Sequence, residues 1–416
     1  MKILFVSMFP IESNTSATIQ NKGIIKGIIN NGHIVDILTV KPNINTQSYD
    51  DSMNDIHTLL GKTYYIELNS KYKLFMAKKD NKSKNILNEN TGLLRLGLKC
   101  IKSFVKKLYY NIAIYDAQKF NVKQVSKLKI DYCKYDIIVS SSDPKSSHLI
   151  VERIYKENQN CRAKWIQYWG DPMFHDITRK KDWRDELVKY SEKKLISKAD
   201  KVFYASPLTL QQQRETFVDL SFKMDYASQT YVDEITHKTK KNQTKSSQKE
   251  VVVVGYFGAY RSGIRNIIPL YNAAKGGNFN LTICGPSDIL LQSTKNVTVY
   301  GSVPYKKSLK MEEESDIIVC ICNSRGTQIP GKIYYCSSYK KPMIVVLDGE
   351  YQEELRNYFN SFDRYIVCEN HEKSINSAIR KAKEKLNNYQ YNINERLTPE
   401  YMGRKILSDF LKLGGN

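Results

Sequence analysis

The sequence lacks the cysteine spacing of disulfide-rich or zinc-binding proteins. Its eight cysteines include no C-x-x-C pair and follow no regular framework. Several of them fall in apolar runs that are predicted to be buried strands. This pattern argues against a disulfide scaffold and against a metal site. We therefore expect structural thiols in a reducing compartment and no bound metal.

Long apolar runs are also missing. No segment approaches the ~20 apolar residues of a membrane-spanning helix. The apolar stretch that follows Met1 and Lys2 ends at Pro10, which is too short for the apolar region of a signal peptide. These absences argue against an integral membrane protein and against a secreted one. We expect a cytoplasmic protein, with peripheral attachment at the inner face of the plasma membrane left open.

Acidic residues are in deficit. Lys and Arg number 64 against 43 Asp and Glu, a formal net charge of +21, and such an excess favours an anionic partner. Residues 61–130 contain sixteen Lys and Arg and four acids, a balance of +12. Within this insertion, leucines and lysines interleave at 93–108, so a helix there would carry an apolar stripe beside a basic one. We expect contact with an anionic membrane surface; a core-packing helix with solvated lysines is the alternative.

The sequence does contain a repeated α/β pattern. Residues 2–7 are predicted to form a buried strand, residues 19–29 carry isoleucines at helical spacing, and residues 34–40 form a second strand. A lysine-rich stretch at 236–249 has no acid and no large apolar residue, which indicates a linker or exposed loop. At 416 residues the chain is too long for one core. We expect two α/β domains, with their boundary near residues 236–249.

Residues 316–347 are the most informative stretch. Two buried strands, at 317–322 and 343–347, flank a loop and a short helix that begins near Lys332. The loop therefore lies at the carboxyl end of a parallel strand, where open α/β sheets bind ligands. Gly331 and Lys332 would present backbone N–H groups and a cation, which favours a phosphate or another anion. An ordinary crossover with a solvated lysine is the alternative.

Other polar residues follow predicted strands at the same edge. Ser16 lies near the start of the first helix, where its hydroxyl would cap the helix or face a phosphate. Arg261 follows the first strand of the second domain, and its guanidinium would meet a diphosphate bidentately. No G-x-G-x-x-G is present, which weighs against a dinucleotide cofactor. Four residues are candidates for acid–base work or acceptor contacts, although each is also a common cap, turn or packing residue: Asp143, His148, Asp171 and His175.

With these landmarks, the chain resembles retaining glycosyltransferases of family 4 and their GT-B relatives over nearly its whole length. The N-terminal segments that carry the resemblance are MKILFVSMFP, NGHIVDILT, DIIVSSSDPKSSHL, WIQYWGDP and ADKVFYAS. The C-terminal ones are VGYFGAYRSG, LTICGP, NVTVYGSVP, ESDIIVCIC and PGKIYYCSSYKKPMIVV. The resemblance rests on their number and order rather than on any single motif.

The resemblance implies two Rossmann-like α/β domains that face each other across a cleft (GT-B), with different roles for the two domains. It places an acceptor-binding domain at 1–235, a domain that binds a nucleotide-sugar at 250–395, and a C-terminal helix at 396–416 that can cross back to the first domain. Arg261 matches the diphosphate-binding arginine of the family, and Arg265 stands in for the lysine that follows it.

One departure from the family concerns the nucleoside site. Lys332 matches a lysine of the family's P-x-K-[IL] variant, but three residues later the family has a glutamate that grips the ribose, and here it is Tyr335. The upstream acidic position is also unfilled, with Asn323 nearby. A phenol can hydrogen-bond a hydroxyl but cannot act as a carboxylate. The other residues expected to contact the donor are Gly258, Gly285, Pro330 and Gly331.

The resemblance implies a hexosyltransferase that is independent of metals and other cofactors. The sequence contains no D-x-D, so cations and helix N-termini would neutralise the leaving diphosphate. The acceptor would be a glycan or a polyprenyl-linked glycan of capsule, O-antigen or exopolysaccharide synthesis, and retention follows from the family. Two alternatives stay open: a nucleotide-sugar epimerase of the same fold, and a basic protein that binds anionic lipid or nucleic acid. Nucleic acid is not expected, because the basic stripe lacks aromatic stacking motifs.

Overall fold

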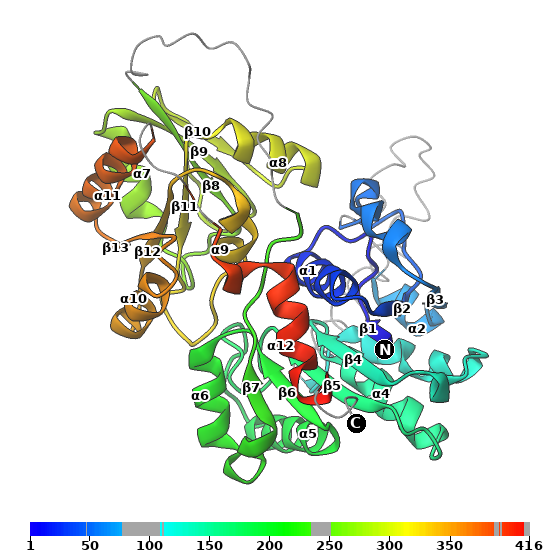
Figure 1. The fold of residues 1–416 in the computed structure, drawn as a ribbon. Helices are drawn as coiled ribbons and strands as arrows, with labels where there is room; N and C mark the ends of the chain where they lie inside the picture. Colours follow the sequence, from blue (N-terminus) through cyan, green and yellow to red (C-terminus); the bar gives the residue numbers. More distant parts are fainter. Residues whose placement is uncertain are drawn as a thin grey trace, which may run out of the picture.

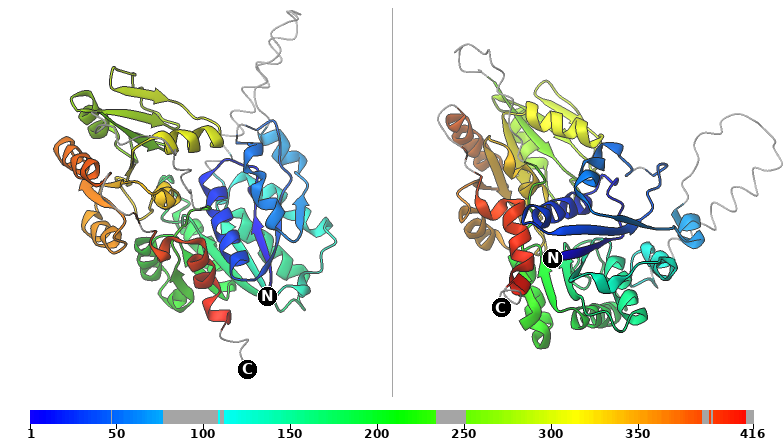
Figure 2. Two further views of the ribbon diagram at one scale, coloured as in Figure 1. Left: turned by 45° about the horizontal axis from the view of Figure 1, so that its top comes forward. Right: turned by 45° about the vertical axis from the view of Figure 1, so that its right-hand side comes forward.

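Two parallel β-sheets, each with an apolar core on both faces, form two domains that face each other (Figure 1, Figure 2). The computed structural model describes residues 1–46, 48–76, 109, 112–233, 251–386, 391 and 393–411. The predicted pair of Rossmann-like α/β domains is confirmed. The leucine–lysine stripe at 93–108 and the linker at 236–249 lie outside the described residues.

The N-terminal sheet has seven strands in the order β3-β2-β1-β4-β5-β6-β7, and every neighbouring pair is parallel. Its central strands are almost wholly buried, as their apolar sequences predict for a sheet that is covered on both faces. The strands are β1 (Lys2–Ser7), β2 (Ile34–Val40), β3 (Thr63–Ile66), β4 (Ile137–Ser142), β5 (Lys164–Trp169), β6 (Lys201–Tyr204) and β7 (Met224–Tyr226).

Helix starts in this domain follow local capping signals. The Thr15 hydroxyl accepts a bond from the Thr18 backbone N–H at 3.2 Å, and Ser206 caps a helix whose first residue is Pro207. The helices are α1 (Ser16–Asn30), α2 (Ser70–Met76), α4 (Ser146–Glu157), α5 (Asp185–Lys198) and α6 (Pro207–Thr216). Shorter 3-10 segments are η1 (Asp51–Leu59), η3 (Ala117–Lys127), η4 (Tyr132–Lys134) and η5 (Val218–Lys223).

The C-terminal sheet has six parallel strands in the order β10-β9-β8-β11-β12-β13. The strands are β8 (Val252–Phe257), β9 (Phe279–Cys284), β10 (Val297–Tyr300), β11 (Ile317–Ile321), β12 (Met343–Leu347) and β13 (Ile366–Glu369). The helices are α7 (Ile268–Lys275), α8 (Tyr305–Glu314), α9 (Lys332–Tyr335), α10 (Gln352–Asn360) and α11 (Glu372–Lys385), with 3-10 segments η6 (Cys336–Ser338) and η7 (Glu395–Leu397). Among the described helices, none has both the length and the apolar composition to span a bilayer.

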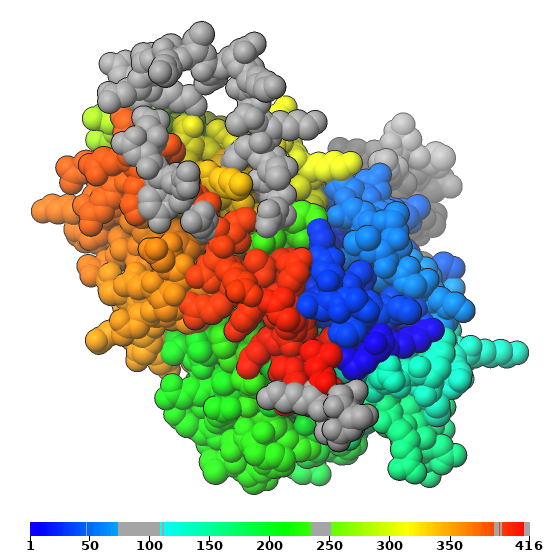
Figure 3. All heavy atoms as spheres, viewed as in Figure 1, coloured from blue at the N-terminus to red at the C-terminus, as the bar shows by residue number. Residues whose placement is uncertain are grey.

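The last helix, α12 (Pro399–Leu411), packs against α1 of the first domain. A Cβ atom built on Gly27 would lie 1.9 Å from the Pro399 carbonyl oxygen, and one on Gly403 would lie 2.3 Å from the Gly27 oxygen. The two backbones therefore touch, which only glycine permits at these positions. In Figure 3 the red α12 residues fill the boundary between the blue, green and orange parts of the surface.

The loop between β11 and α9 joins the two domains. The Ser206 and Thr209 hydroxyls both donate to the Thr327 carbonyl oxygen, at 2.7 and 3.2 Å. The Gln328 side-chain amide donates to the His175 carbonyl oxygen at 3.0 Å. These buried polar contacts fix the loop against the N-terminal domain, and the cleft lies beside it.

Candidate functional site

The cleft between the sheets holds two adjoining pockets. We call them the central pocket, of about 330 Å³, and the C-domain pocket, of about 440 Å³. Both are lined from both domains. They share Ser16, Ala259, Arg265, Pro330 and Gly331.

The structure brings together the residues predicted for the site except His148 and His175, which line neither pocket. Four of them line the central pocket but not the C-domain pocket: Asp143, Asp171, Arg261 and Asn323. Four line only the C-domain pocket: Gly258, Gly285, Lys332 and Tyr335. The shared lining holds the other four: Ser16, Arg265, Pro330 and Gly331. Their contacts with a ligand stay predictions.

The C-domain pocket has a floor that admits no larger residue. A Cβ atom built on Gly285 would lie 2.0 Å from the Gly258 carbonyl oxygen. The loops that follow β8 and β9 can approach this closely only because Gly285 has no side chain. A ligand in the pocket therefore meets backbone at this point.

Two arginines give the C-terminal wall of the cleft its positive charge. Arg265 donates from Nε to Asn323 Oδ1 at 2.8 Å and from Nη1 to the Ala259 carbonyl oxygen at 2.9 Å. Both partners are neutral oxygens, so they orient the guanidinium without cancelling its charge. Arg261 is exposed at the rim of the central pocket. The planar guanidinium groups suit an anion that offers several oxygens, such as a diphosphate.

Lys332 differs from these arginines because it already has a carboxylate partner. Its ammonium group lies 2.6 Å from Glu312 Oε1, and Glu312 is 1% exposed. Burial by itself lowers the pKa of Lys332, but the Glu312 charge outweighs it and raises that pKa well above the usual value. The Tyr339 hydroxyl, at 3.2 Å, and the Ser308 hydroxyl, at 2.8 Å, also donate to Glu312. Lys332 is therefore a neutralised cation with a fixed position.

The predicted short helix that begins near Lys332 is confirmed. α9 has four residues and continues as the 3-10 segment η6. A single turn has a small dipole, so its N-terminus contributes little to anion binding. The 15-residue α1 also begins at the cleft, where Thr15 and Ser16 line the C-domain pocket.

Tyr335 joins the two domains. Its hydroxyl donates to the Ser16 carbonyl oxygen at 2.8 Å and lies 3.1 Å from the Ser16 hydroxyl. The phenol thus reaches across the cleft at the position where the resembled family has a glutamate. A carboxylate could not donate this bond.

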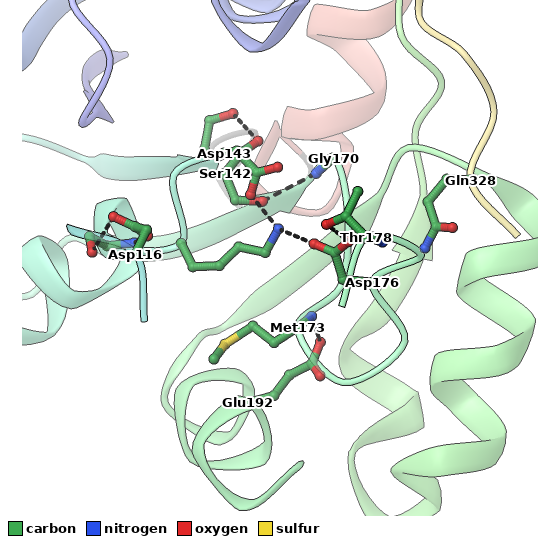
Figure 4. A network of polar contacts seen from close by, with 12 residues as sticks. Asp116, Ser142, Asp143, Gly170, Met173, Asp176, Thr178, Glu192 and Gln328 are labelled. Carbon is green, nitrogen blue, oxygen red and sulfur yellow. Dashed lines mark hydrogen bonds and ion pairs between the residues drawn. The ribbon is translucent and has the colours of Figure 1, made fainter. Parts of the chain in front are cut away.

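The N-terminal wall of the cleft is acidic. Lys145 lies between Asp143, with which it forms a hydrogen bond, and Asp176, whose carboxylate is 3.5 Å away. Figure 4 shows Asp143 and Asp176 in the middle of this network. Burial and the neighbouring Asp143 raise the pKa of Asp171 from its ordinary value of 3.8 to about 7. Asp171 can therefore exchange a proton near neutral pH.

A buried glutamate holds the loop that carries Asp171. Glu192, on α5, accepts bonds from the backbone N–H groups of Met173 at 3.0 Å and Phe174 at 2.8 Å (Figure 4). Burial raises the pKa of Glu192 to about 7. The loop conformation after β5 thus depends on one side chain of the following helix.

His148 lies in the core and not in the cleft, so its predicted contact with an acceptor is wrong. Its ring is fully buried, stacks on Trp169 at 4.3 Å and has Nδ1 2.8 Å from the Ser140 hydroxyl. Burial lowers its pKa to about 3, so the ring is neutral. His175 is also occupied: its Nε2 lies 2.9 Å from the Thr216 hydroxyl.

Several cleft residues had no distinguishing sequence signal. Glu312 is one of three consecutive glutamates at the end of α8. Its pairing with Lys332, twenty residues later, is visible only in the structure. Gln20, Gln229 and Gln328 line the central pocket, yet glutamine is common and follows no spacing here. Among the described residues, no three His, Cys, Asp or Glu side chains are grouped to hold a metal ion.

Comparison with known proteins supports the fold. No protein-family model matches the chain, and no curated protein does. A glycosyltransferase from Rickettsia africae aligns over 100% of this chain and 99% of its own, with a TM-score of 0.50 and 15% identity. A UDP-GlcNAc 2-epimerase from Neisseria meningitidis, bound to UDP-GlcNAc, aligns over 99% and 100% with a TM-score of 0.50 and 14% identity.

A third solved structure, α,α-trehalose 6-phosphate synthase from Burkholderia multivorans, aligns over 98% of this chain and 95% of its own, with a TM-score of 0.50 and 10% identity. At such identities the likeness concerns the fold alone. The predicted GT-B fold is therefore confirmed, and membership of family 4 stays a prediction.

Proposed function

We propose that the protein is a glycosyltransferase that moves a sugar from a nucleotide-sugar to a glycan or polyprenyl-linked acceptor. The observation that carries this proposal is the opposition of charge across one cleft. Arg261 and Arg265 stand on the C-terminal wall, and Asp143 and Asp171 stand on the N-terminal wall. The similar solved structures include a glycosyltransferase and an epimerase bound to UDP-GlcNAc, which supports a nucleotide-sugar as the substrate.

The arginines would act on the leaving group. When the bond between the sugar and the diphosphate breaks, negative charge grows on the diphosphate oxygens. Donors that are fixed in advance stabilise such charge without reorganisation. Arg265 is held by Asn323 and Ala259, so its guanidinium is already oriented. The proposed reaction retains the anomeric configuration, as in the family that the sequence resembles, so the acceptor hydroxyl attacks the face of the sugar from which the diphosphate leaves.

The carboxylates would act on the acceptor. An incoming hydroxyl must lose its proton as it attacks the sugar. Asp171 has a pKa of about 7, which matches a group that takes up a proton at neutral pH. The proposed acceptor is a growing glycan of capsule, O-antigen or exopolysaccharide synthesis, met at the cytoplasmic face of a membrane.

The test combines donor binding with two arginine variants. Thermal stabilisation by a panel of nucleotide-sugars identifies the donor, because a ligand that binds the folded state raises the melting temperature. With that donor, Arg261→Ala and Arg265→Ala should each lower kcat/KM on the order of 10²-fold. Arg356→Ala is the matched control, because Arg356 pairs with Glu369 outside both pockets. Wild-type rates in both cleft variants would contradict the proposal.

Nucleotide-sugar epimerisation is a second candidate. The clustering of Asp143 and Asp171 in the central pocket favours it, because exchanging a proton at a sugar carbon also needs carboxylates in that cleft. An epimerase converts the donor without any acceptor. Incubation of the identified donor alone, followed by NMR of the sugar product, distinguishes the two reactions.

A further inference from the structure

The outer face of α5 and the turn before it carry large apolar side chains that no described part of the chain covers. Trp183 is 68% exposed, Leu187 is 47% exposed and Tyr190 is 66% exposed. Trp183 lies in the turn just before α5, and their spacing of three residues makes Leu187 and Tyr190 neighbours on the surface of the helix. α5 lies at the lower end of the N-terminal domain in Figure 1.

This face is opposite the face that α5 buries. Val188, Leu195 and Ile196 are 3% exposed or less and belong to the core of the N-terminal domain. Folding therefore explains the inner stripe but not the outer one. Contiguous exposed apolar side chains on a soluble domain mark a surface for binding.

The same surface continues onto η5. Val218 and Phe222 are 70% and 75% exposed. An ion pair of 2.9 Å joins Lys193 to Asp219, and Lys223 Nζ donates to the Ser197 carbonyl oxygen at 2.7 Å. These contacts hold η5 beside the C-terminal half of α5. We call the exposed apolar residues of both segments the α5–η5 surface: Trp183, Leu187, Tyr190, Val218 and Phe222.

Lysines surround this surface. Those exposed on α5 or just before it are Lys180, Lys181, Lys193, Lys194 and Lys198. Lys193 pairs with Asp219 and Lys198 with Glu152, so Lys180, Lys181 and Lys194 carry the charge that this surface offers. Tryptophan and tyrosine beside lysines are the side chains that favour the boundary between lipid headgroups and acyl chains. The charge complements an anionic headgroup, and the apolar rings complement the layer beneath it.

A third pocket opens beside this surface. The N-domain pocket, of about 680 Å³, is lined by Arg179, Lys180 and Arg184 from the segment that leads into α5. It also shares Asp143 and Thr178 with the central pocket of the cleft. The segment before Trp183 thus borders a cavity that adjoins the proposed reaction site.

The chain on either side of the leucine–lysine stripe also reaches this pocket. Tyr72 and Ala113, the first before and the second after residues 77–108, both line it. Two described residues that are far apart in the sequence therefore line the same cavity.

We infer that the α5–η5 surface docks the protein on an anionic lipid bilayer. Docking there would bring the mouth of the N-domain pocket to the bilayer. An acceptor with a lipid anchor would then present its sugar to the N-domain pocket while its lipid stays in the bilayer. This role of the acceptor rests on the proposed function, whereas docking on the bilayer does not.

Sedimentation with lipid vesicles tests the inference without any donor or acceptor. Vesicles of phosphatidylcholine are compared with vesicles that also contain phosphatidylglycerol, and the wild type should bind the anionic ones more tightly. The variant Trp183→Ser, Leu187→Ser, Tyr190→Ser should lose at least about tenfold in partitioning. The variant Lys181→Gln, Lys194→Gln should lose about fivefold for each lysine, since a lysine near an anionic surface contributes about 1 kcal/mol.

Matched controls separate docking from general effects. Leu290→Ser removes an apolar side chain that is 93% exposed in the C-terminal domain, and Lys381→Gln, Lys383→Gln removes two exposed lysines of α11. Neither should change partitioning. Thermal melts check that the α5 variants fold.

Several results would overturn the inference. They are equal binding of the wild type to both kinds of vesicle, unchanged partitioning of the α5 variants, and equal losses in the controls. A change in oligomeric state or in nucleic-acid binding on α5 substitution, with vesicle binding intact, would assign the surface to a second copy or to nucleic acid instead. Because donor turnover in solution is measured separately, failure here leaves the proposed reaction open to its own test.

Discussion

The two walls of the cleft hold their charges in different ways. On the C-terminal wall, neutral oxygens orient Arg265 and leave its charge uncancelled. On the N-terminal wall, Asp143 and Asp176 share one lysine, and burial keeps Asp171 protonated well above its usual range. The first arrangement suits a ligand that brings its own negative charge. The second suits a neutral ligand whose hydroxyl gives up a proton.

Lys332 shows that a cation at a cleft does not by itself bind an anion. It lines the C-domain pocket, and Arg261 and Arg265 also line the cleft. Unlike them, however, Lys332 is already neutralised by Glu312. Lys332 is therefore less available to bind a phosphate than Arg261 and Arg265 are. Positive charge in a sequence identifies a candidate, and only its partners show whether that charge is available.

The strongest way to test the acidic wall is Asp171→Asn. The substitution keeps the shape of the side chain and removes its ability to take up a proton. If Asp171 accepts the proton of the acceptor hydroxyl, kcat should fall on the order of 10²-fold, and donor binding should change little. Steady-state kinetics together with donor titration make this measurement. An unchanged kcat would show that another group takes up the proton of the acceptor hydroxyl.

The pH dependence of stability gives the same substitution a second readout. Because the pKa of Asp171 rises from 3.8 to about 7 on folding, the folded state binds its proton more tightly than the unfolded chain does. The wild type therefore loses stability as pH rises from about 4 to about 7. Asp171→Asn should be more stable than the wild type above pH 7, and the difference should shrink towards pH 4. Asp409→Asn, at a surface ion pair with Lys201, should show no such trend.

A smaller effect is expected at the contact that joins the walls. Tyr335→Phe removes the hydroxyl that donates to the Ser16 carbonyl oxygen, a loss of about 1 kcal/mol. The domains should then close less readily on the donor, and KM should rise about fivefold with little change in kcat. Tyr365→Phe is the control, because its hydroxyl donates to the Ile333 carbonyl oxygen within one domain. A lower kcat with unchanged KM would place Tyr335 in the chemical step instead.

The fold could be predicted from the sequence because parallel strands that are buried on both faces are apolar throughout. Runs such as 317–321 and 343–347 are apolar without alternation, and both are central strands. Strand order then placed the following loops at one edge, so most of the predicted site residues do meet. The length of α9 was not predictable in the same way. Whether a helix continues past its first turn depends on tertiary packing.

Partners far apart in the sequence were beyond prediction. Glu312 and Lys332 are joined only when α8 and α9 pack together. Tyr335 meets Ser16 only when the two domains face each other. The spacing of residues within one helix or strand cannot predict such long-range contacts. A single histidine after a strand likewise gives no sign of whether its ring turns to the cleft or to the core.

The smallest effect on activity is expected at His148, beneath the acidic wall. Its neutral ring accepts or donates a bond at the Ser140 hydroxyl and stacks on Trp169, so His148→Gln should lower the free energy of unfolding by about 1–2 kcal/mol. Activity per folded molecule should stay within about twofold of the wild type. Burial lowers the pKa of His148 to about 3, so its contribution to stability is complete above pH 6.5 and is lost as the pH falls from 6.5 towards 3. The variant should therefore lose less stability than the wild type over that acidic range in thermal melts. A large loss of kcat at neutral pH in a folded His148→Gln protein would instead show that His148 contributes to the reaction from the core.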